Sequence, residues 1–237
     1  MVGKTLSLCI TNFNRDRMLF ESFQNVLNDD RVSEIVIVDD CSPESIYKRV
    51  REYTKGYDKV KLFKNRKNLG CYRNKAEAIR MATNEFVIIF DSDNIMTKKY
   101  IDKIFEQDWD ENTILAPDYV VSFDYRHFAD NVLTRNNVAK FVDKPRFDCL
   151  INTMNYFVHK DNYLKVWDGS IEPWTADTIY QNYRWLESGR SFKIVRGLEY
   201  EHRIKHNLRE EKSHYTTHVR QTGNLFNNIM NKLRRLQ

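Results

Sequence analysis

The chain has 237 residues, of which 41% are hydrophobic and 13% aromatic, and this composition excludes a wholly disordered protein. Its length supports one substantial core, and no apolar run approaches the roughly 20 residues needed to span a bilayer. The net charge of +5 favours an anionic partner, but it does not distinguish nucleotides, membrane surfaces and nucleic acid. The four scattered cysteines form no CxxC pair, which is typical of reduced thiols and predicts a cytoplasmic protein.

In the first 95 residues, short apolar stretches alternate with segments of helical periodicity. The N-terminal apolar stretch ends in polar residues, so we expect a first strand there rather than a signal peptide. The alternation indicates βαβ units around a mostly parallel sheet, in a single α/β domain. The expected strands are 5–11, 34–40, 60–64 and 85–90, and the expected helices are 17–27, 43–53 and 71–83.

The second half of the chain is less regular. We expect strands within 113–126 and 153–160 and at 191–195, and a helix at 175–189 that Thr175 caps and Gly189 ends.

The C-terminal segment, 218–237, has the pattern of an amphipathic basic helix. Both a solvated helix face and a peripheral membrane contact are consistent with that pattern.

Polar clusters follow three of the expected strands, at Thr11–Arg15, Asp39–Ser42 and Asp91–Asn94. Ligands of open parallel sheets bind at the carboxyl ends of the strands, so we expect these clusters to meet in one pocket.

Asp91 and Asp93 come directly after the apolar stretch 86–90. Two carboxylates at this place cannot both be buried as bare charges, and a divalent cation with oxygen ligands, Mg²⁺ or Mn²⁺, offsets that cost. The D-x-D spacing alone also occurs in ordinary acidic loops. Its position after a buried strand is what favours a metal that in turn holds phosphates.

The segments "TNFNR", "VDDCSPE" and "NLGCYRNKAEAIRMATNEFVIIFDSDN", in this order, resemble the nucleotide-sugar-binding half of glycosyltransferase family 2, which has the GT-A fold. The family writes them roughly as T-x-Y-N-R, V-D-D-x-S and N-x-G-x-x-x-x-R-N followed by a D-x-D. Downstream, "WTADTIYQNYRWLESG" and "LEYEHRIKHN" also resemble family segments, with Ala176 where a Glu is common and Asp177 retained.

The resemblance implies an inverting, metal-dependent transfer of a sugar from a nucleotide donor, with a UDP-sugar favoured, to a glycan hydroxyl. It also implies Mn²⁺ or Mg²⁺ as cofactor. We expect no nucleic-acid partner, because the basic residues are dispersed along the chain. We divide the chain into a donor half at 1–95, an acceptor and catalytic half at 96–210, and a basic helical tail at 211–237.

The resemblance also implies roles for individual residues. Asp177 would be the general base, Asp93 a metal ligand with His202 or His206, and Trp174 an acceptor contact. The implied donor-binding residues are Thr11, Phe13, Asn14, Arg15, Asp40, Arg73, Asn74 and Asp91.

Each of these residues also has an ordinary structural interpretation. Asp40 could cap the helix that begins near Pro43, and Asp177 could be a first-turn helix residue. His202 could be a hydrogen-bonded structural histidine, Arg73 a solvated helix residue, and Trp174 a packing residue, as we expect for Trp185.

Two rival functions fit the sequence less well. A sugar-nucleotide pyrophosphorylase needs a glycine-rich loop after the first strand, and "TNFNRDR" has no glycine. A nucleic-acid-binding protein is permitted by the charge, but the basic residues are dispersed and form no recognised motif.

Overall fold

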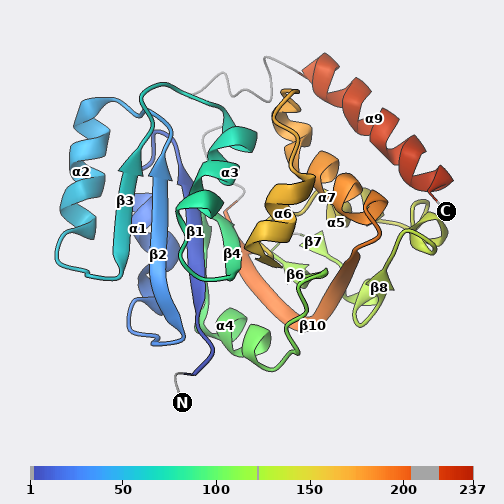
Figure 1. Cartoon of the computed structure of the whole chain (residues 1–237), viewed down its shortest axis with the longest axis horizontal. Coiled ribbons are helices and arrows are strands. Elements are labelled where there is room, and N and C mark those ends of the chain that lie inside the picture. Colours follow the sequence, from blue (N-terminus) through green and yellow to red (C-terminus); the bar gives the residue numbers. More distant parts are fainter. Residues whose placement is uncertain (1–2, 122, 204–218, 237) are drawn as a thin grey trace.

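The computed structural model describes residues 3–121, 123–203 and 219–236, and within these the strands form one sheet (Figure 1). The strands are β1 (Leu6–Asn12), β2 (Val32–Asp39), β3 (Val60–Lys64), β4 (Phe86–Asp91), β5 (Asn94–Ile95), β6 (Thr113–Val120), β7 (Phe123–Asp124), β8 (Val132–Leu133), β9 (Phe157–His159) and β10 (Ser191–His202). Their order is β3–β2–β1–β4–β9–β6–β10–β5, with β7 beside β6 and β8 beside β10.

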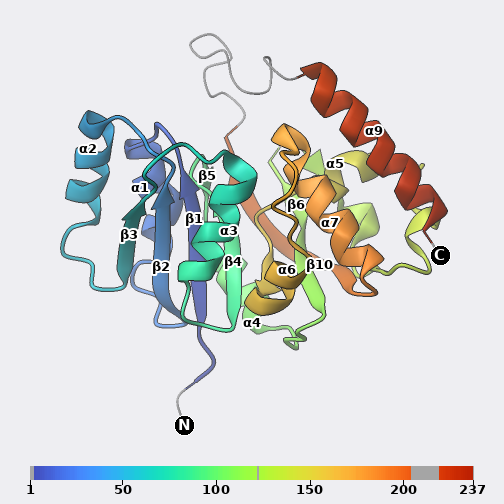
Figure 2. The ribbon, with the colours of Figure 1, turned by 45° about the horizontal axis from the view of Figure 1, so that its top comes forward.

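Helices cover the sheet and connect its strands. The α-helices are α1 (Arg17–Phe23), α2 (Glu44–Thr54), α3 (Cys71–Met81), α4 (Lys98–Phe105), α5 (Phe147–Ile151), α6 (Lys160–Val166), α7 (Asp177–Glu187) and α9 (Val219–Arg235). Short 3₁₀ turns are η1 (Gln24–Val26), η2 (Arg126–Phe128), η3 (Val138–Lys140) and η4 (Trp174–Ala176). In Figures 1 and 2, α3, α6 and α7 lie together on one face of the sheet, whereas α1 lies behind it.

The first four strands confirm the predicted βαβ half. β1 runs parallel to β2 on one side and to β4 on the other, so that Cys9 lies opposite both Val36 and Ile89. The central strands are buried on both faces, which explains why their sequences are continuous apolar runs rather than alternating ones.

The second half adds a parallel pair, β6 and β10, joined to β4 through the short antiparallel strand β9. β10 extends well beyond the predicted strand at 191–195. Its ladder with β6 is irregular between Val195 and Glu199, where Gly197 has a φ of +75° that favours glycine. Beyond this bend, the end of β10 pairs antiparallel with β5, the strand that directly follows Asp93.

The predicted helix at 175–189 begins later than expected, at Asp177. Thr175 is not its cap, because it lies in the preceding turn η4 and its hydroxyl donates to Thr222 Oγ1 of α9, 3.1 Å away. Gly189 follows the end of the helix with a φ of +87°, as a helix stop requires.

The C-terminal helix α9 packs along α7 and η4 at the far side of the molecule from α2 (Figures 1 and 2). Its apolar side chains Ile229, Met230 and Leu233 are buried against the domain. The apolar face that a peripheral membrane contact would use is therefore occupied by the protein itself. In the part of the chain that the structure describes, no helix is both long and apolar enough to cross a membrane.

A buried carboxylate ties the amino ends of the central strands together, at the edge opposite the polar clusters. Glu34 accepts hydrogen bonds from Ser7 Oγ at 2.5 Å and Thr83 Oγ1 at 2.8 Å, and pairs with Lys61 Nζ at 2.5 Å. Burial opposes the charged form, but the bonds from Lys61, Ser7 and Thr83 outweigh it and lower the pKa of Glu34 to about 2.

Candidate functional site

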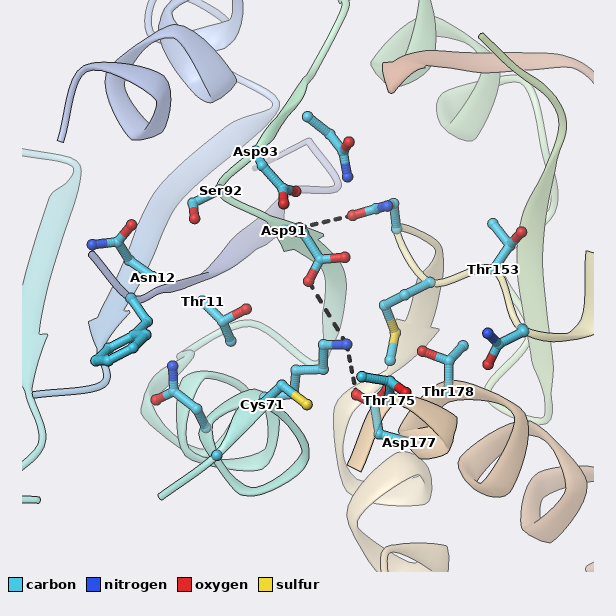
Figure 3. Close-up of a pocket in the computed structure, with 18 of the residues that line it drawn as sticks. Thr11, Asn12, Cys71, Asp91, Ser92, Asp93, Thr153, Thr175, Asp177 and Thr178 are labelled. Atoms are coloured by element: carbon cyan, nitrogen blue, oxygen red, sulfur yellow. Dashed lines mark hydrogen bonds and ion pairs between the residues drawn. The ribbon is translucent and has the colours of Figure 1, made fainter. Parts of the chain in front are cut away.

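A cavity of about 1150 Å³ lies at the carboxyl ends of β1, β2 and β4, as the polar clusters predict (Figure 3). Every described residue to which the sequence assigned a role in binding or chemistry lines it. These residues are Thr11, Phe13, Asn14, Arg15, Asp40, Arg73, Asn74, Asp91, Asp93, Trp174, Asp177 and His202.

The ends of β1 and β4 meet at the floor of the cavity. Thr11 lies opposite Asp91 in the parallel ladder, and the Ser92 N–H donates to the Thr11 carbonyl at 3.3 Å. The chain then leaves β4 so that Asp93 faces the loop after β1, and the Arg15 guanidinium pairs with Asp93, with 2.9 Å between Nη2 and Oδ2. The register of two strands thus fixes where both carboxylates of the D-x-D pattern lie.

Asp40 holds the loop that leads into α3. Its carboxylate accepts hydrogen bonds from the backbone N–H groups of Leu69 and Gly70, at 2.8 and 2.9 Å, and from Asn65 Nδ2 at 2.8 Å. Burial raises the pKa of Asp40 in spite of these bonds. The helix-cap interpretation does not hold, because the N-cap of α2 is Pro43, which makes no side-chain cap hydrogen bond, and Asp40 bonds to the loop before α3 instead.

Arg73 and Asn74 line the cavity from α3, but their polar atoms are directed at the protein. Arg73 Nη2 donates to the Gly169 carbonyl at 3.4 Å, and its Nε lies 3.9 Å from Glu172 Oε2. Asn74 is buried and donates to the Val38 carbonyl at 3.0 Å. Arg73 therefore lies on the side of the cavity formed by the segment before α7.

A third cation that lines the cavity, Lys75, is not among the site residues predicted from the sequence. Its ammonium lies 2.8 Å from Asp177 Oδ2 and 3.7 Å from Asp91 Oδ1, and Figure 3 shows both interactions as dashed lines to one nitrogen. Lys75 is only 5% exposed. Burial opposes its charge, but Asp177 and Asp91 outweigh burial and hold the pKa of Lys75 well above its usual value.

A signal for Lys75 was present in the helix periodicity. The buried face of α3 carries Tyr72, Ala76 and Ile79, and Lys75 falls on that face, three residues after Tyr72. A charged residue in an apolar stripe is rare unless it is paired, so such a position points to a buried partner.

Asp177 is the first residue of α7 and is 5% exposed. It follows η4, in which Trp174 adopts a left-handed backbone with a φ of +52° that is uncommon for a residue other than glycine. The Trp174 carbonyl lies 3.4 Å from Cys71 Sγ at the start of α3. The turn thus brings the predicted base and the predicted acceptor contact to the same wall of the cavity.

His202 reaches the cavity from the end of β10, opposite Asn94 in the antiparallel pairing with β5. Its Nδ1 lies 2.7 Å from Asn94 Oδ1, one residue after Asp93. The alternative ligand, His206, lies outside the described residues.

The charges of the cavity lining are unbalanced. Five carboxylates face three cations, which gives a formal charge of −2 with His202 neutral. Each of the three lining cations has a carboxylate within 4 Å: Arg15 pairs with Asp93, Arg73 with Glu172, and Lys75 with both Asp177 and Asp91. A polyanionic ligand therefore needs either additional positive charge or the rearrangement of one of these pairs.

Among the described residues, no three His, Cys, Asp or Glu side chains lie close enough to enclose a metal ion. Mg²⁺-type sites seldom need such a cage, because one or two carboxylates and the phosphates of the substrate supply the oxygens. Asp93 and His202, on adjacent strand ends, have the donor chemistry of such a shared site.

Comparison with known proteins assigns the family. The family model described as glycosyl transferase family 2 matches residues 7–194, which is most of the chain. The chain belongs to glycosyl transferase family 2. Family 2 is a family of inverting glycosyltransferases.

Solved structures support the fold of the family 2 chain. S. aureus TarS 1-349 matches with a TM-score of 0.64 and 16% identity, over 84% of this chain and 60% of that one. Its complex with UDP-GlcNAc matches with a TM-score of 0.69 and 15% identity, over 95% and 65%. The chain thus spans about two thirds of the solved chains or less, and these matches confirm the predicted GT-A fold. No curated protein matches the chain.

The family match ends at residue 194, before the bend of β10 and before α9. The division into a donor half and an acceptor half at residue 95 stays a prediction, as do the roles of the individual residues.

Proposed function

We propose that the family 2 chain transfers a sugar from a UDP-sugar to a hydroxyl group of a glycan acceptor, with Mn²⁺ or Mg²⁺ as cofactor. One observation carries the proposal. The carboxylates Asp91, Asp93 and Asp177 line a single cavity whose cations are already paired with carboxylates.

This charge balance favours a metal cofactor. A nucleoside diphosphate is strongly anionic, and the lining presents more carboxylates than cations. Asp93 and His202 would hold the cation, together with oxygens of the donor. When bound, the cation supplies positive charge where negative charge develops on the departing diphosphate.

The nucleoside end is assigned to the wall formed by the ends of β1 and β2. Asp40 would accept a hydrogen bond from the uracil imide, and Thr11 and Phe13 would flank the nucleoside. The TarS complexes with UDP and with UDP-GlcNAc support a uridine donor for a chain of the same fold. They also make UDP-GlcNAc the first donor to test.

The acceptor end is assigned to the wall formed by η4 and α7. Asp177 takes the proton of the incoming hydroxyl as the general base, and Trp174 forms a surface against which the acceptor packs. Lys75 binds Asp177 through Oδ2, which offsets the cost of burying the carboxylate, and we assign Oδ1 to the acceptor hydroxyl. A single base on the side of the anomeric carbon opposite the leaving group produces inversion, as the family requires.

The test is calorimetric UDP binding with and without Mn²⁺, followed by hydrolysis of UDP-GlcNAc, UDP-glucose, UDP-galactose, a GDP-sugar and a dTDP-sugar. We expect binding and hydrolysis that depend on Mn²⁺ and favour UDP-sugars. Asp93→Asn should abolish both, because the neutral amide lacks the negative charge with which a carboxylate attracts a divalent cation.

The matched control is Asp130→Asn. Asp130 is exposed, pairs with Arg196 at 2.7 Å and lies outside the cavity, so its amide variant should behave like the wild type. Full Mn²⁺-dependent activity in Asp93→Asn would overturn the metal role.

A further inference from the structure

The pair between Arg15 and Asp93 occupies the carboxylate that the proposed function gives to the metal. Arg15 Nη2 lies 2.9 Å from Asp93 Oδ2, and the two side chains are 35% and 18% exposed. Both residues line the cavity. A guanidinium that binds this oxygen competes with a metal for the same carboxylate, and its positive charge repels the metal.

The backbone beside Arg15 is fixed, whereas its side chain is long. Asn14 adopts a left-handed backbone with a φ of +57°, and its N–H donates to Ser42 Oγ at 2.8 Å. The turn is thereby attached to the end of β2. The guanidinium can consequently leave Asp93 by side-chain rotation, without moving the strand ends that form the cavity.

Arg15 is better placed for exchange than the other two lining cations. Lys75 is buried between two carboxylates, and its removal from them would leave both unpaired. Arg73 lies toward Gly169 and Glu172, on the wall that precedes α7. Only Arg15, of the three lining cations described, pairs with the carboxylate after β4 that the proposed function assigns to the metal.

We propose, on the basis of the proposed function, that Arg15 couples metal binding to donor binding. In the free enzyme its guanidinium binds the Asp93 carboxylate, to which the metal would otherwise bind. When the nucleoside diphosphate arrives, the guanidinium moves to the diphosphate, which offers it two charged oxygens, and it no longer competes with the metal for Asp93. Metal alone then binds weakly, and each ligand strengthens the binding of the other by the same factor.

The test is Mn²⁺ binding to metal-free protein, measured without and with UDP by the paramagnetic resonance signal of free Mn²⁺. Arg15→Met should bind Mn²⁺ alone about 10-fold more tightly than the wild type, because competition and repulsion are both removed. The same variant should bind UDP in the presence of Mn²⁺ about 10-fold more weakly, because a bidentate phosphate contact is lost. If Arg15 had a purely structural role, Arg15→Met would weaken the binding of both Mn²⁺ and UDP.

The matched control is Arg17→Met. Arg17 pairs with Glu21, is 84% exposed and does not line the cavity, so its variant measures the general effect of losing one positive charge. If circular dichroism shows that the methionine variant is unfolded, Arg15→Gln repeats the comparison with a polar side chain. The gain in Mn²⁺ affinity should vanish when Asp93→Asn is added.

Failure of the coupling and failure of the proposed function give different results. If wild type binds Mn²⁺ with UDP but neither Arg15 variant binds Mn²⁺ alone more tightly than Arg17→Met, the coupling is overturned and the proposed function stands. If wild type binds no Mn²⁺ even with UDP, the metal-dependent function is overturned, and the coupling with it.

Discussion

The ammonium of Lys75 lies 2.8 Å from Oδ2 of Asp177, although the two residues are 102 positions apart in the chain. The pair joins α3 of the predicted donor half to the start of α7 in the predicted acceptor half. Because both side chains are buried, removing the charge of Lys75 would leave the Asp177 carboxylate without its ion-pair partner.

Lys75→Met should therefore destabilise the protein by about 3 kcal/mol or more, the usual cost of breaking a buried ion pair. It should also lower transfer, because Asp177 loses the contact that orients it. The double variant Lys75→Met, Asp177→Asn should be more stable than the sum of the two single effects predicts. Urea unfolding of the three variants measures this coupling.

A pair nearer the surface provides the control for this experiment. Lys99 pairs with Glu199 at 2.5 Å, with side chains that are 55% and 36% exposed, so Lys99→Met should cost no more than about 1 kcal/mol. Equal costs for Lys75→Met and Lys99→Met would contradict the assigned importance of the buried pair.

Asp177→Asn should retain UDP binding but lose transfer by about 100-fold or more, because an amide cannot take the proton of the acceptor. Asp161→Asn tests whether any acidic residue in a first helical turn has this effect. Asp161 is exposed in the first turn of α6 and does not line the cavity, so its variant should keep normal turnover. Normal turnover in Asp177→Asn would place the base elsewhere.

Glu34 should make folding stability depend on pH. Its pKa is about 2 in the folded protein against a usual 4.5, so its contribution is fully present above pH 4.5 and is lost as the pH falls through about 2. Glu34→Gln should cost about 2–3 kcal/mol at pH 7, and much of the difference from wild type should disappear near pH 2. Thermal unfolding at several pH values measures it, and a difference independent of pH would contradict the prediction.

The packing of α9 should contribute to global stability. Leu233 is fully buried, so Leu233→Ala should lower the free energy of unfolding by about 3 kcal/mol. Arg235→Ala, on the exposed face of the same helix, should change it by less than about 0.5 kcal/mol. If Leu233→Ala left the stability unchanged, α9 would not be part of the folded domain.

The donor half could be predicted closely from the sequence, since its strands are apolar runs bounded by helices of clear periodicity. β3 has the predicted bounds, and β1, β2 and β4 differ from them by one or two residues at each end. The convergence of the polar clusters followed from a general property of parallel sheets, the position of their carboxyl ends.

The second half could not be predicted as well, because its elements are short or depend on distant neighbours. β9 lies within the predicted range 153–160, but it has only three residues, which pair with β4 on one side and β6 on the other. The sequence pattern predicts neither α4 nor α6. The partners of Lys75 and the covering of the apolar face of α9 are tertiary contacts, and local periodicity carries no information about which segment supplies them.

The bend of β10 at Gly197 has a consequence for engineering. The strand begins beside β6, in the region that we assign to the acceptor, and ends with His202 beside the loop that carries Asp93. An acceptor-binding segment from another transferase therefore cannot replace this region without affecting the donor side. If the replacement included the whole of β10, the recipient protein would lose His202, which lies next to its own D-x-D loop.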